Sequence, residues 1–243
     1  MGTTVASLWR YPVKSMAGEA LDHVELDSRG LVGDRWYAVT DDDGHLASGK
    51  DTRRFRRRDA VFQYAARTTP EGVLVMGAEG ELLVGDRALD AMLTTRMGAP
   101  VRVLPEASVS HQDQGQVSLV GTATLAWCAE RWGIDADPRR LRVNLLVETT
   151  EPFVEETWVG RRLDLGDARL TVAERIPRCR MIDVEQVGVA TRGRWLKPLG
   201  GERDTCIAVY ADVTRPGVVR VGDGVLVGND EGKEPEPPAT PKV

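Results

Sequence analysis

Short apolar and β-branched runs separated by glycine-containing turns constrain the fold of this chain more than any other feature. In the first hundred residues these runs predict strands at residues 5–13, 21–27, 35–40, 61–68, 73–76 and 81–84. The turns between some of them contain Asp43-Gly44, Glu71-Gly72 and Glu79-Gly80, where glycine tolerates the positive φ angles of tight hairpins. A short helix at residues 88–97 and a strand at residues 101–104 complete a small β-rich module.

The second half of the chain shows the same strand pattern around one clear helix. Apolar residues from Leu125 to Trp132 recur at i, i+3, i+4 and i+7, which predicts a helix at residues 122–132 that ends at Gly133. Strands are predicted at residues 141–148, 161–165, 168–173 and 205–213, followed by a hairpin at residues 218–227. Because helices are too few for alternating βαβ units, we expect a mostly-β, barrel-like fold with a few helices, in the α+β class.

The polar, irregular segment that starts at residue 105 is interpreted as the link between two modules. We therefore expect an N-terminal domain at residues 1–104 and a second domain at residues 105–228. Residues 229–243 are rich in proline and charged side chains, and we expect them to be disordered.

Composition excludes several classes of protein. The net charge of -5 argues against a protein that coats nucleic acid, so no nucleic-acid partner is expected. No stretch is apolar enough for a signal peptide or a membrane span, which predicts a cytoplasmic protein with no membrane partner. The three cysteines form no CxxC pair, so a disulfide framework, a zinc knuckle and a built-in iron–sulfur cluster are not expected. Electrons for any redox reaction would have to come from an external protein.

Cys179 is the thiol with the most unusual surroundings. Pro177 interrupts the segment, and Arg178 and Arg180 flank the cysteine, so their positive charges favour the reactive thiolate. A buried structural cysteine is the alternative. Cys128 lies on the apolar face of the predicted helix and Cys206 at the start of a predicted strand, so we interpret both as structural.

Three further groups of polar residues can bind an anion. Lys14 and Ser15 follow the first strand and offer a cation and a hydroxyl, although a solvated loop end is equally compatible with the pattern. Two glycines before Arg35 allow a sharp backbone turn that aims its side chain. Arg142 and Asn144 lie two residues apart on a predicted strand and share a face, where either an anionic ligand or an internal ion pair would satisfy them. The basic run at residues 53–58 is interpreted as a solvated face.

Several ordered motifs resemble those of one known family. They are Tyr11-Pro12-Val13-Lys14-Ser15-Met16, Gly30-Leu31-Val32-Gly33-Asp34-Arg35-Trp36, Ser48-Gly49-Lys50, Arg142-Val143-Asn144, Glu156 and Trp158, Arg178-Cys179, and Pro216-Gly217-Val218-Val219-Arg220-Val221-Gly222-Asp223. In this order and spacing they resemble the MOSC family, whose domain takes its name from the C-terminal part of molybdenum cofactor sulfurase. The resemblance spans nearly the whole chain and implies an N-terminal β-barrel domain followed by a MOSC β-barrel domain.

The resemblance also implies a cofactor and a reaction. The cofactor would be the molybdenum cofactor (molybdopterin), with Cys179 as the catalytic thiolate ligand of the metal; no pyridoxal phosphate is expected. Lys14, Ser15, Arg35 and Arg142 match family positions that bind the cofactor phosphate, and Asn144 is similar to a residue that supports this pocket. By their places in the family motifs, Arg178, Gln114 and Gly115 would also bind the cofactor. At residues 113–115 this chain has Asp-Gln-Gly where reductase relatives carry Asp-Thr-Ser, so it keeps the acid and lacks both hydroxyls.

The implied reaction is the two-electron reduction of an N-hydroxylated small-molecule substrate, with electrons from a separate electron-transfer protein. Two alternatives remain open. One is a sulfur carrier or sulfurtransferase that forms a persulfide on Cys179. The other is a module that binds the cofactor and catalyses nothing.

Overall fold

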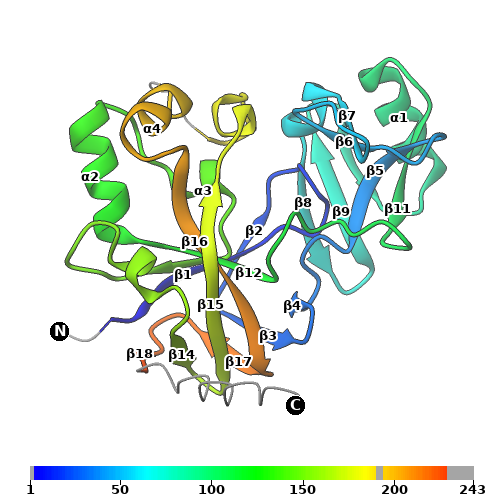
Figure 1. Ribbon diagram of the computed structural model, residues 1–243. Helices are drawn as coiled ribbons and strands as arrows, with labels where there is room; N and C mark the ends of the chain where they lie inside the picture. Colours follow the sequence, from blue (N-terminus) through cyan, green and yellow to red (C-terminus); the bar gives the residue numbers. More distant parts are fainter. Residues whose placement is uncertain (1–2, 190–193, 229–243) are drawn as a thin grey trace, which may run out of the picture.

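A computed structural model describes residues 3–189 and 194–228, and the described chain forms two β-rich lobes (Figure 1). The large lobe is built on an eight-stranded sheet with the strand order β18-β14-β15-β16-β12-β13-β1-β2. These strands are β1 (Val5–Arg10), β2 (Glu19–Leu21), β12 (Val117–Gly121), β13 (Leu145–Val147), β14 (Arg162–Leu165), β15 (Ala168–Pro177), β16 (Cys206–Arg215) and β18 (Val225–Val227). Neighbouring strands are antiparallel except β12 and β13, which are parallel.

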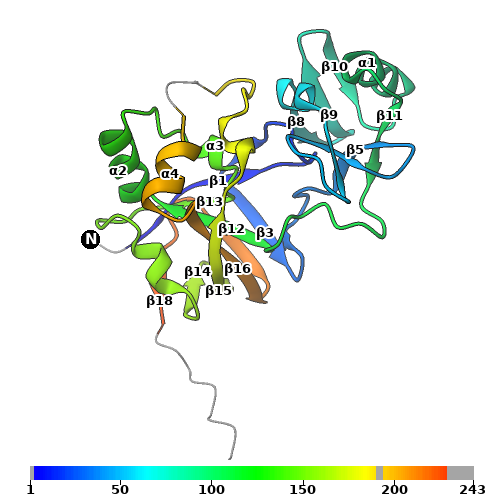
Figure 2. The same ribbon diagram turned by 45° about the horizontal axis from the view of Figure 1, so that its top comes forward.

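A second, three-stranded sheet packs against the eight-stranded one. It has the order β17-β3-β4, with β3 (His23–Asp27), β4 (Gly30–Leu31) and β17 (Gly217–Arg220). Apolar side chains of both sheets, such as Leu26, Val219 and Leu170, form one core. The helices α2 (Thr122–Trp132), α3 (Pro138–Leu141) and α4 (Leu196–Glu202) gather at the opposite end of the lobe around a second core that contains Trp195 (Figures 1 and 2).

The small lobe consists of two sheets and one helix. One sheet has the order β11-β5-β6-β7 and the other β10-β9-β8. Their bounds are β5 (Tyr37–Asp41), β6 (Leu46–Ser48), β7 (Phe55–Arg57), β8 (Ala65–Thr69), β9 (Gly72–Gly77), β10 (Gly80–Leu83) and β11 (Val101–Pro105). Helix α1 (Arg87–Met97) begins at Asp86, whose side chain accepts the N–H of Ala88, and ends at Gly98 in the left-handed conformation. Its buried Leu89 and Leu93 fill the core of the lobe.

The chain passes from the large lobe to the small lobe and back. Strands β1 to β4 come from the first 31 residues but lie in the sheets of the large lobe. A domain boundary after residue 104 therefore separates strands that are hydrogen-bonded in the same sheets. That division stays a prediction. The segment between β1 and β2 crosses to the small lobe, where Val13 pairs with Tyr37 and Ala17 with Ala65. Residues 14 and 15 therefore lie where the lobes meet.

The mostly-β class with few helices is confirmed, as is the helix at residues 122–132. In each sheet of the described residues the last strand does not pair with the first, so these sheets are not closed barrels. The predicted strand 61–68 begins instead as a 3-10 turn, Asp59–Gln63, because an apolar run alone does not distinguish a buried turn from a strand. The predicted tail at residues 229–243 lies outside the described residues.

Two further predictions are wrong. Residues 141–148 are not one strand, because Asp137 caps the short helix α3, Pro138 occupies its first turn, and β13 begins only at Leu145. Residues 218–227 are not a hairpin, because β17 pairs with β3 while β18 pairs with β14.

No helix among the described residues is long and apolar enough to cross a membrane.

Candidate functional site

A cavity of about 330 Å³ opens where the two lobes meet. It is lined by every residue that the sequence analysis nominated, namely Lys14, Ser15, Arg35, Gln114, Gly115, Arg142, Asn144, Arg178 and Cys179. These residues come from five separate stretches of the chain. The fold thus gathers into one cavity side chains that are up to 165 positions apart.

The cavity wall is strongly cationic. Among its lining residues are six lysines and arginines, namely Lys14, Arg35, Lys50, Arg140, Arg142 and Arg178, and two carboxylates, Asp34 and Asp113. The chain as a whole carries a net charge of -5. Positive charge is therefore concentrated at this cavity, which makes it the place where the protein can best bind an anion.

One wall of the cavity is held together by polar contacts within the protein. Arg35 forms an ion pair with Asp34, which is fully buried, and donates to the Arg142 carbonyl at 2.9 Å. The Asn144 side-chain oxygen accepts the Ser118 hydroxyl at 2.9 Å and lies 3.4 Å from Arg35. Burial lowers the pKa of Arg35, but the Asp34 carboxylate more than offsets this and the net shift is upward. We call Asp34, Arg35, Ser118 and Asn144 the paired wall.

Two further arginines that line the cavity, Arg142 and Arg178, have no carboxylate partner among the described residues. Arg142 donates to the Met16 carbonyl at 2.6 Å and Arg178 to the Leu141 carbonyl at 2.7 Å. Burial lowers the pKa of each guanidinium to about 10. The Nη2 atom of Arg178 is buried and has no hydrogen-bond partner within residues 3–189 and 194–228. We call Arg142 and Arg178 the unpaired wall, since buried charges of this kind are costly until a ligand compensates them.

Lys14 is buried and lies at the edge of the unpaired wall. Its ammonium donates to the His111 carbonyl at 2.6 Å and lies 3.2 Å from Asp113. Burial lowers the pKa of Lys14 to about 8, although Asp113 opposes the shift. In turn, burial raises the pKa of Asp113, but Lys14 and Lys50 bring it down to about 2.

Three lining residues have left-handed backbone conformations that residues other than glycine rarely adopt. They are Ser15 with φ 70°, Arg35 with φ 52° and Arg142 with φ 54°. Arg142 ends helix α3 in this conformation, so it does not share a strand face with Asn144 as the sequence predicted. Both side chains nevertheless line the cavity. Strained residues cluster at functional sites because surrounding contacts hold them there, which supports a functional role for this cavity.

Cys179 lies on the cavity wall directly after β15, at the start of the 3-10 turn Arg180–Asp183. Its two neighbouring arginines differ. Arg180 pairs with Asp59 of the small lobe at 2.9 Å, whereas Arg178 has no carboxylate partner in the part of the chain that the structure describes. The thiol is half-buried, while Cys128 is fully buried and burial raises the pKa of its thiol to about 12. Cys206 is half-buried as well, but of the three cysteines Cys179 alone lines the cavity, and Cys128 is a core residue.

Sequence reasoning did not nominate several residues of the cavity, of which Tyr210, Lys50 and Arg140 are the polar ones with the largest side chains. Tyr210 lies within β16 and had no motif to distinguish it. A Cβ atom at Gly115 would lie 2.5 Å from the Cβ of Tyr210. This contact explains the glycine at this position, because a serine would collide with the tyrosine.

Other motifs from the sequence lie outside the cavity. Glu156 pairs with Arg175 at 2.9 Å and with Arg203, and Trp158 is buried in the core of the large lobe. The basic run at residues 53–58 is only partly a solvated face. Phe55 is buried, and Arg58 pairs with Asp41 at 3.1 Å.

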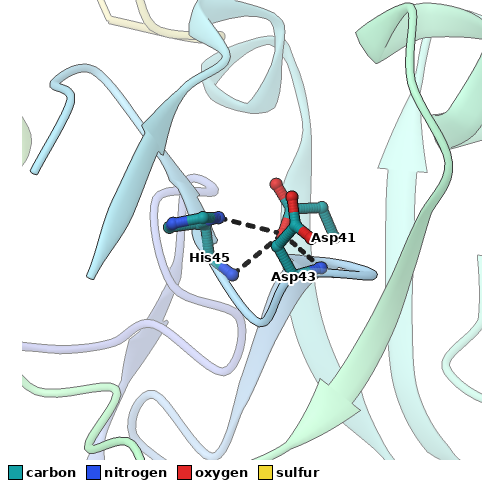
Figure 3. Close-up of side chains that lie close together, drawn as sticks. All are labelled: Asp41, Asp43 and His45. Carbon is teal, nitrogen blue, oxygen red and sulfur yellow. Dashed lines mark hydrogen bonds and ion pairs between the residues drawn. The ribbon is translucent and has the colours of Figure 1, made fainter. Parts of the chain in front are cut away.

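Asp41, Asp43 and His45 form a separate cluster whose possible ligand atoms lie within 4.8 Å of one another (Figure 3). The Asp41 carboxylate accepts the backbone N–H groups of Asp43 at 3.2 Å and His45 at 2.9 Å. It also pairs with Arg58. These contacts close the turn between β5 and β6, so the turn itself accounts for the cluster.

The fold and the site together define a class of protein that is mostly β and has a half-buried thiol in a cationic cavity. The profile of the MOSC domain matches residues 94–226, and that of the MOSC N-terminal beta barrel domain matches residues 2–95. The chain therefore belongs to the MOSC domain family.

Two curated relatives show how much of this chain the sequence similarity covers. The chain is 22% identical over 285 residues to mitochondrial amidoxime reducing component 2 of Bos taurus, covering 91% of this chain and 82% of that protein. It is 24% identical over 239 residues to molybdenum cofactor sulfurase of Danio rerio, covering 75% of this chain but only 28% of the relative. Among solved structures, the YUAD protein from Bacillus subtilis aligns with a TM-score of 0.49 at 16% identity, covering 93% of this chain and 96% of that one.

Proposed function

We propose that this protein binds the molybdenum cofactor in the cavity between its lobes, with Cys179 as the thiolate ligand of the metal, and reduces N-hydroxylated small molecules. One observation carries the proposal. The Cys179 thiol lines the same cavity as the unpaired wall, in which the Nη2 atom of Arg178 is buried without a partner. A thiolate is a soft ligand suited to a thiophilic metal, and the buried cations suit the phosphate of a pterin cofactor.

The residues present fit this cofactor. A cavity of about 330 Å³ lies within the range of roughly 300–1,000 Å³ that is usual for cofactor sites. The excess of cations over carboxylates in the wall requires an anion. The Ser15 hydroxyl would replace one of the hydroxyls missing at residues 114 and 115 by turning its single O–H from the Ala47 carbonyl, to which it donates at 3.0 Å, toward the phosphate.

Each group of residues has its own part in binding. Lys14, Ser15, Arg35 and Arg142 would hold the phosphate, and Arg178 would donate its unpaired N–H. Asn144 acts through Arg35, because its side-chain oxygen and the Asp34 carboxylate both accept from Nη1 of that guanidinium. The aromatic ring of Tyr11 supports this arrangement, since the guanidinium carbons of Arg35 and Arg142 lie 4.8 and 4.4 Å from its centroid.

When bound, the cofactor would supply the two-electron change that reduces an N–O bond. The overall reaction consumes two electrons, delivered by a separate electron-transfer protein, and two protons, and it releases water. Two groups in the cavity wall can donate protons, the Tyr210 hydroxyl and the Lys14 ammonium. Lys14 is the better placed of the two near neutral pH, because its pKa is about 8 whereas burial raises that of Tyr210.

A sulfur carrier is the second candidate function. It is favoured by the position of Cys179 at the start of a short turn, half-exposed, where a persulfide could be presented to another molecule. A relative named molybdenum cofactor sulfurase points in the same direction. This candidate predicts a labile sulfane sulfur on Cys179 and no requirement for metal.

Metal content tests the proposal directly. We expect wild type and the matched control Cys206→Ser, purified from a host that makes the cofactor, to retain stoichiometric molybdenum by elemental analysis. The Cys179→Ser variant is expected to lose the metal. Wild type should then reduce benzamidoxime with a chemical electron donor.

Three outcomes separate the candidates. Wild type without molybdenum but with sulfane sulfur on Cys179 would favour the sulfur carrier. Molybdenum without reduction of any amidoxime or hydroxylamine would leave a cofactor-binding module. Molybdenum retained in Cys179→Ser would refute the thiolate ligand.

A further inference from the structure

Three cations converge on one buried aromatic ring beside the cavity. The Lys14 and Lys50 ammonium nitrogens lie 5.1 and 4.8 Å from the centroid of Phe55, and the guanidinium carbon of Arg54 lies at 4.6 Å. One ring contributes at most a modest attraction to each cation. The ring alone therefore does not explain why three positive charges share this place.

Carboxylates do not balance these charges. Asp113 is the one carboxylate within ion-pair distance among the described residues, at 3.2 Å from Lys14 and 3.8 Å from Arg54. Lys50 has no ion pair in the described part of the chain. In addition, the Nε atom of Arg54 is buried without a hydrogen-bond partner. The group is left with more positive than negative charge, and one of its donors is unused.

Part of this group opens onto the same cavity as Cys179, since Lys14, Lys50 and Asp113 line it, whereas Arg54 and Phe55 lie behind these lining residues. The unpaired wall of Arg142 and Arg178 belongs to the large lobe, whereas Lys50 and Arg54 belong to the small lobe, next to β6 and β7. Lys14 lies on the crossing segment between the lobes. The cavity therefore offers cations on two sides, more than a single phosphate needs.

We propose that Lys50, together with Lys14, which it would share with the first phosphate, and with Arg54 on the same Phe55 ring, forms a second oxyanion site, which takes a carboxylate or phosphate group of a ligand bound in the cavity. Lysine ammonium groups suit this task because they bind oxyanions as point charges and do not require a fixed fork geometry. The oxyanion can belong to the substrate, as a carboxylate, or to the cofactor, as an additional phosphate. The inference rests on the proposed function for the identity of the rest of that ligand, but not for the site itself.

Binding of inorganic pyrophosphate to the cofactor-free protein tests the site without any metal. Titration calorimetry would compare wild type with Lys50→Gln and with the matched control Lys197→Gln, an exposed lysine on α4. We expect Lys50→Gln to weaken binding about tenfold, as for the loss of one charge-assisted hydrogen bond. The control should bind like wild type. Equal binding by wild type and Lys50→Gln, with both folded by thermal unfolding, would overturn the proposal.

A second measurement on the molybdenum-loaded protein identifies the source of the oxyanion. It compares kcat/KM for 4-carboxybenzamidoxime and for benzamidoxime, which lacks the carboxylate. If Lys50→Gln lowers kcat/KM only for the carboxylated substrate, the site recognises the substrate. If it lowers molybdenum content and both activities together, the oxyanion belongs to the cofactor. If wild type reduces neither substrate, the reductase proposal fails, while pyrophosphate binding still decides the second site.

Discussion

The paired and unpaired walls of the cavity differ in what satisfies their polar groups. In the paired wall, the Arg35 charge is met by buried Asp34, and the Asn144 side chain is bonded at both its oxygen and its nitrogen. In the unpaired wall, Arg142 and Arg178 donate to backbone carbonyls, Arg142 also lies over the Tyr11 ring, and among the described residues neither has a carboxylate partner and Nη2 of Arg178 has no hydrogen-bond partner. Two sets of polar residues that line one cavity thus have their charges and hydrogen-bonding groups compensated in different ways.

This difference separates residues whose charges are already compensated within the protein, even where they would also contact a ligand as Arg35 would, from residues whose charges a ligand would have to compensate. A buried polar group whose partners are all within the protein contributes to stability, and its removal leaves those partners unsatisfied. A buried cation without a counter-charge costs free energy in the empty protein and recovers it on binding. The walls should therefore respond to mutation in different ways, the first in stability and the second in affinity.

The largest effect is expected for Asp34→Asn. This change removes the counter-charge of Arg35 while preserving the shape of the side chain and its contact with the Tyr11 N–H at 2.8 Å. Because it leaves a buried guanidinium uncompensated, we expect the free energy of unfolding to fall by about 3 kcal/mol. Urea denaturation measures this loss. A change below about 1 kcal/mol would mean that the paired wall is not structural and would break the comparison.

Arg178→Gln should show the opposite pattern. The glutamine amide can still donate to one of the carbonyls that Arg178 contacts, and the variant no longer carries an uncompensated charge, so stability should change by less than about 1 kcal/mol. Affinity of the cofactor-free protein for inorganic phosphate should fall about tenfold, because a charged donor is lost. Calorimetry and urea denaturation on the same sample check both. A large loss of stability with unchanged phosphate affinity would place Arg178 with the paired wall.

The sequence predicted the members of the site better than their geometry. Motifs brought Lys14, Arg35, Arg142 and Cys179 to attention, and all four line one cavity. The predicted strand through Arg142 was wrong, because Asp137 and Pro138 start a helix there and the arginine takes a left-handed conformation. A run of aliphatic residues does not reveal such a conformation, which tertiary contacts impose.

The difference between the walls could not be predicted from the sequence. The sequence places Asp34 beside Arg35, but only the fold shows that this carboxylate is buried and paired with the arginine, and that Arg178 has no carboxylate partner among the described residues. Tyr210 was missed for a related reason. Its role at the cavity depends on its packing against Gly115, which is 95 positions away in the chain.

For Lys14 we predict that phosphate affinity and the stability of the protein change in opposite directions as the pH rises. Its pKa in the folded protein is about 8, below the unfolded value of 10.5, mainly because of burial. Phosphate affinity should therefore fall as the pH rises from 7 to 9 and the ammonium loses its proton.

Stability of the cofactor-free protein should rise between about pH 8 and 10.5, because the unfolded chain binds more protons than the folded one in that range. Titrations of wild type against Lys14→Met isolate both effects, since other groups titrate alike in the two proteins. If phosphate affinity and stability depend on pH in the same way in both proteins, the Lys14 ammonium is not the group whose loss of a proton changes them.

The smallest effect is expected for Asp59→Asn, which tests the arginine on the other side of Cys179. Arg180 pairs with Asp59, but both side chains are more than a third exposed, so loss of the pair should cost less than about 1 kcal/mol. The turn after Cys179 keeps other contacts, including those from Arg140 to the Ile182 and Val184 carbonyls at 3.2 Å. Phosphate affinity should therefore match that of wild type, in contrast to Arg178→Gln. A loss of affinity as large as in Arg178→Gln would show that the two flanking arginines act together and that pairing with a carboxylate is a poor guide to function in this cavity.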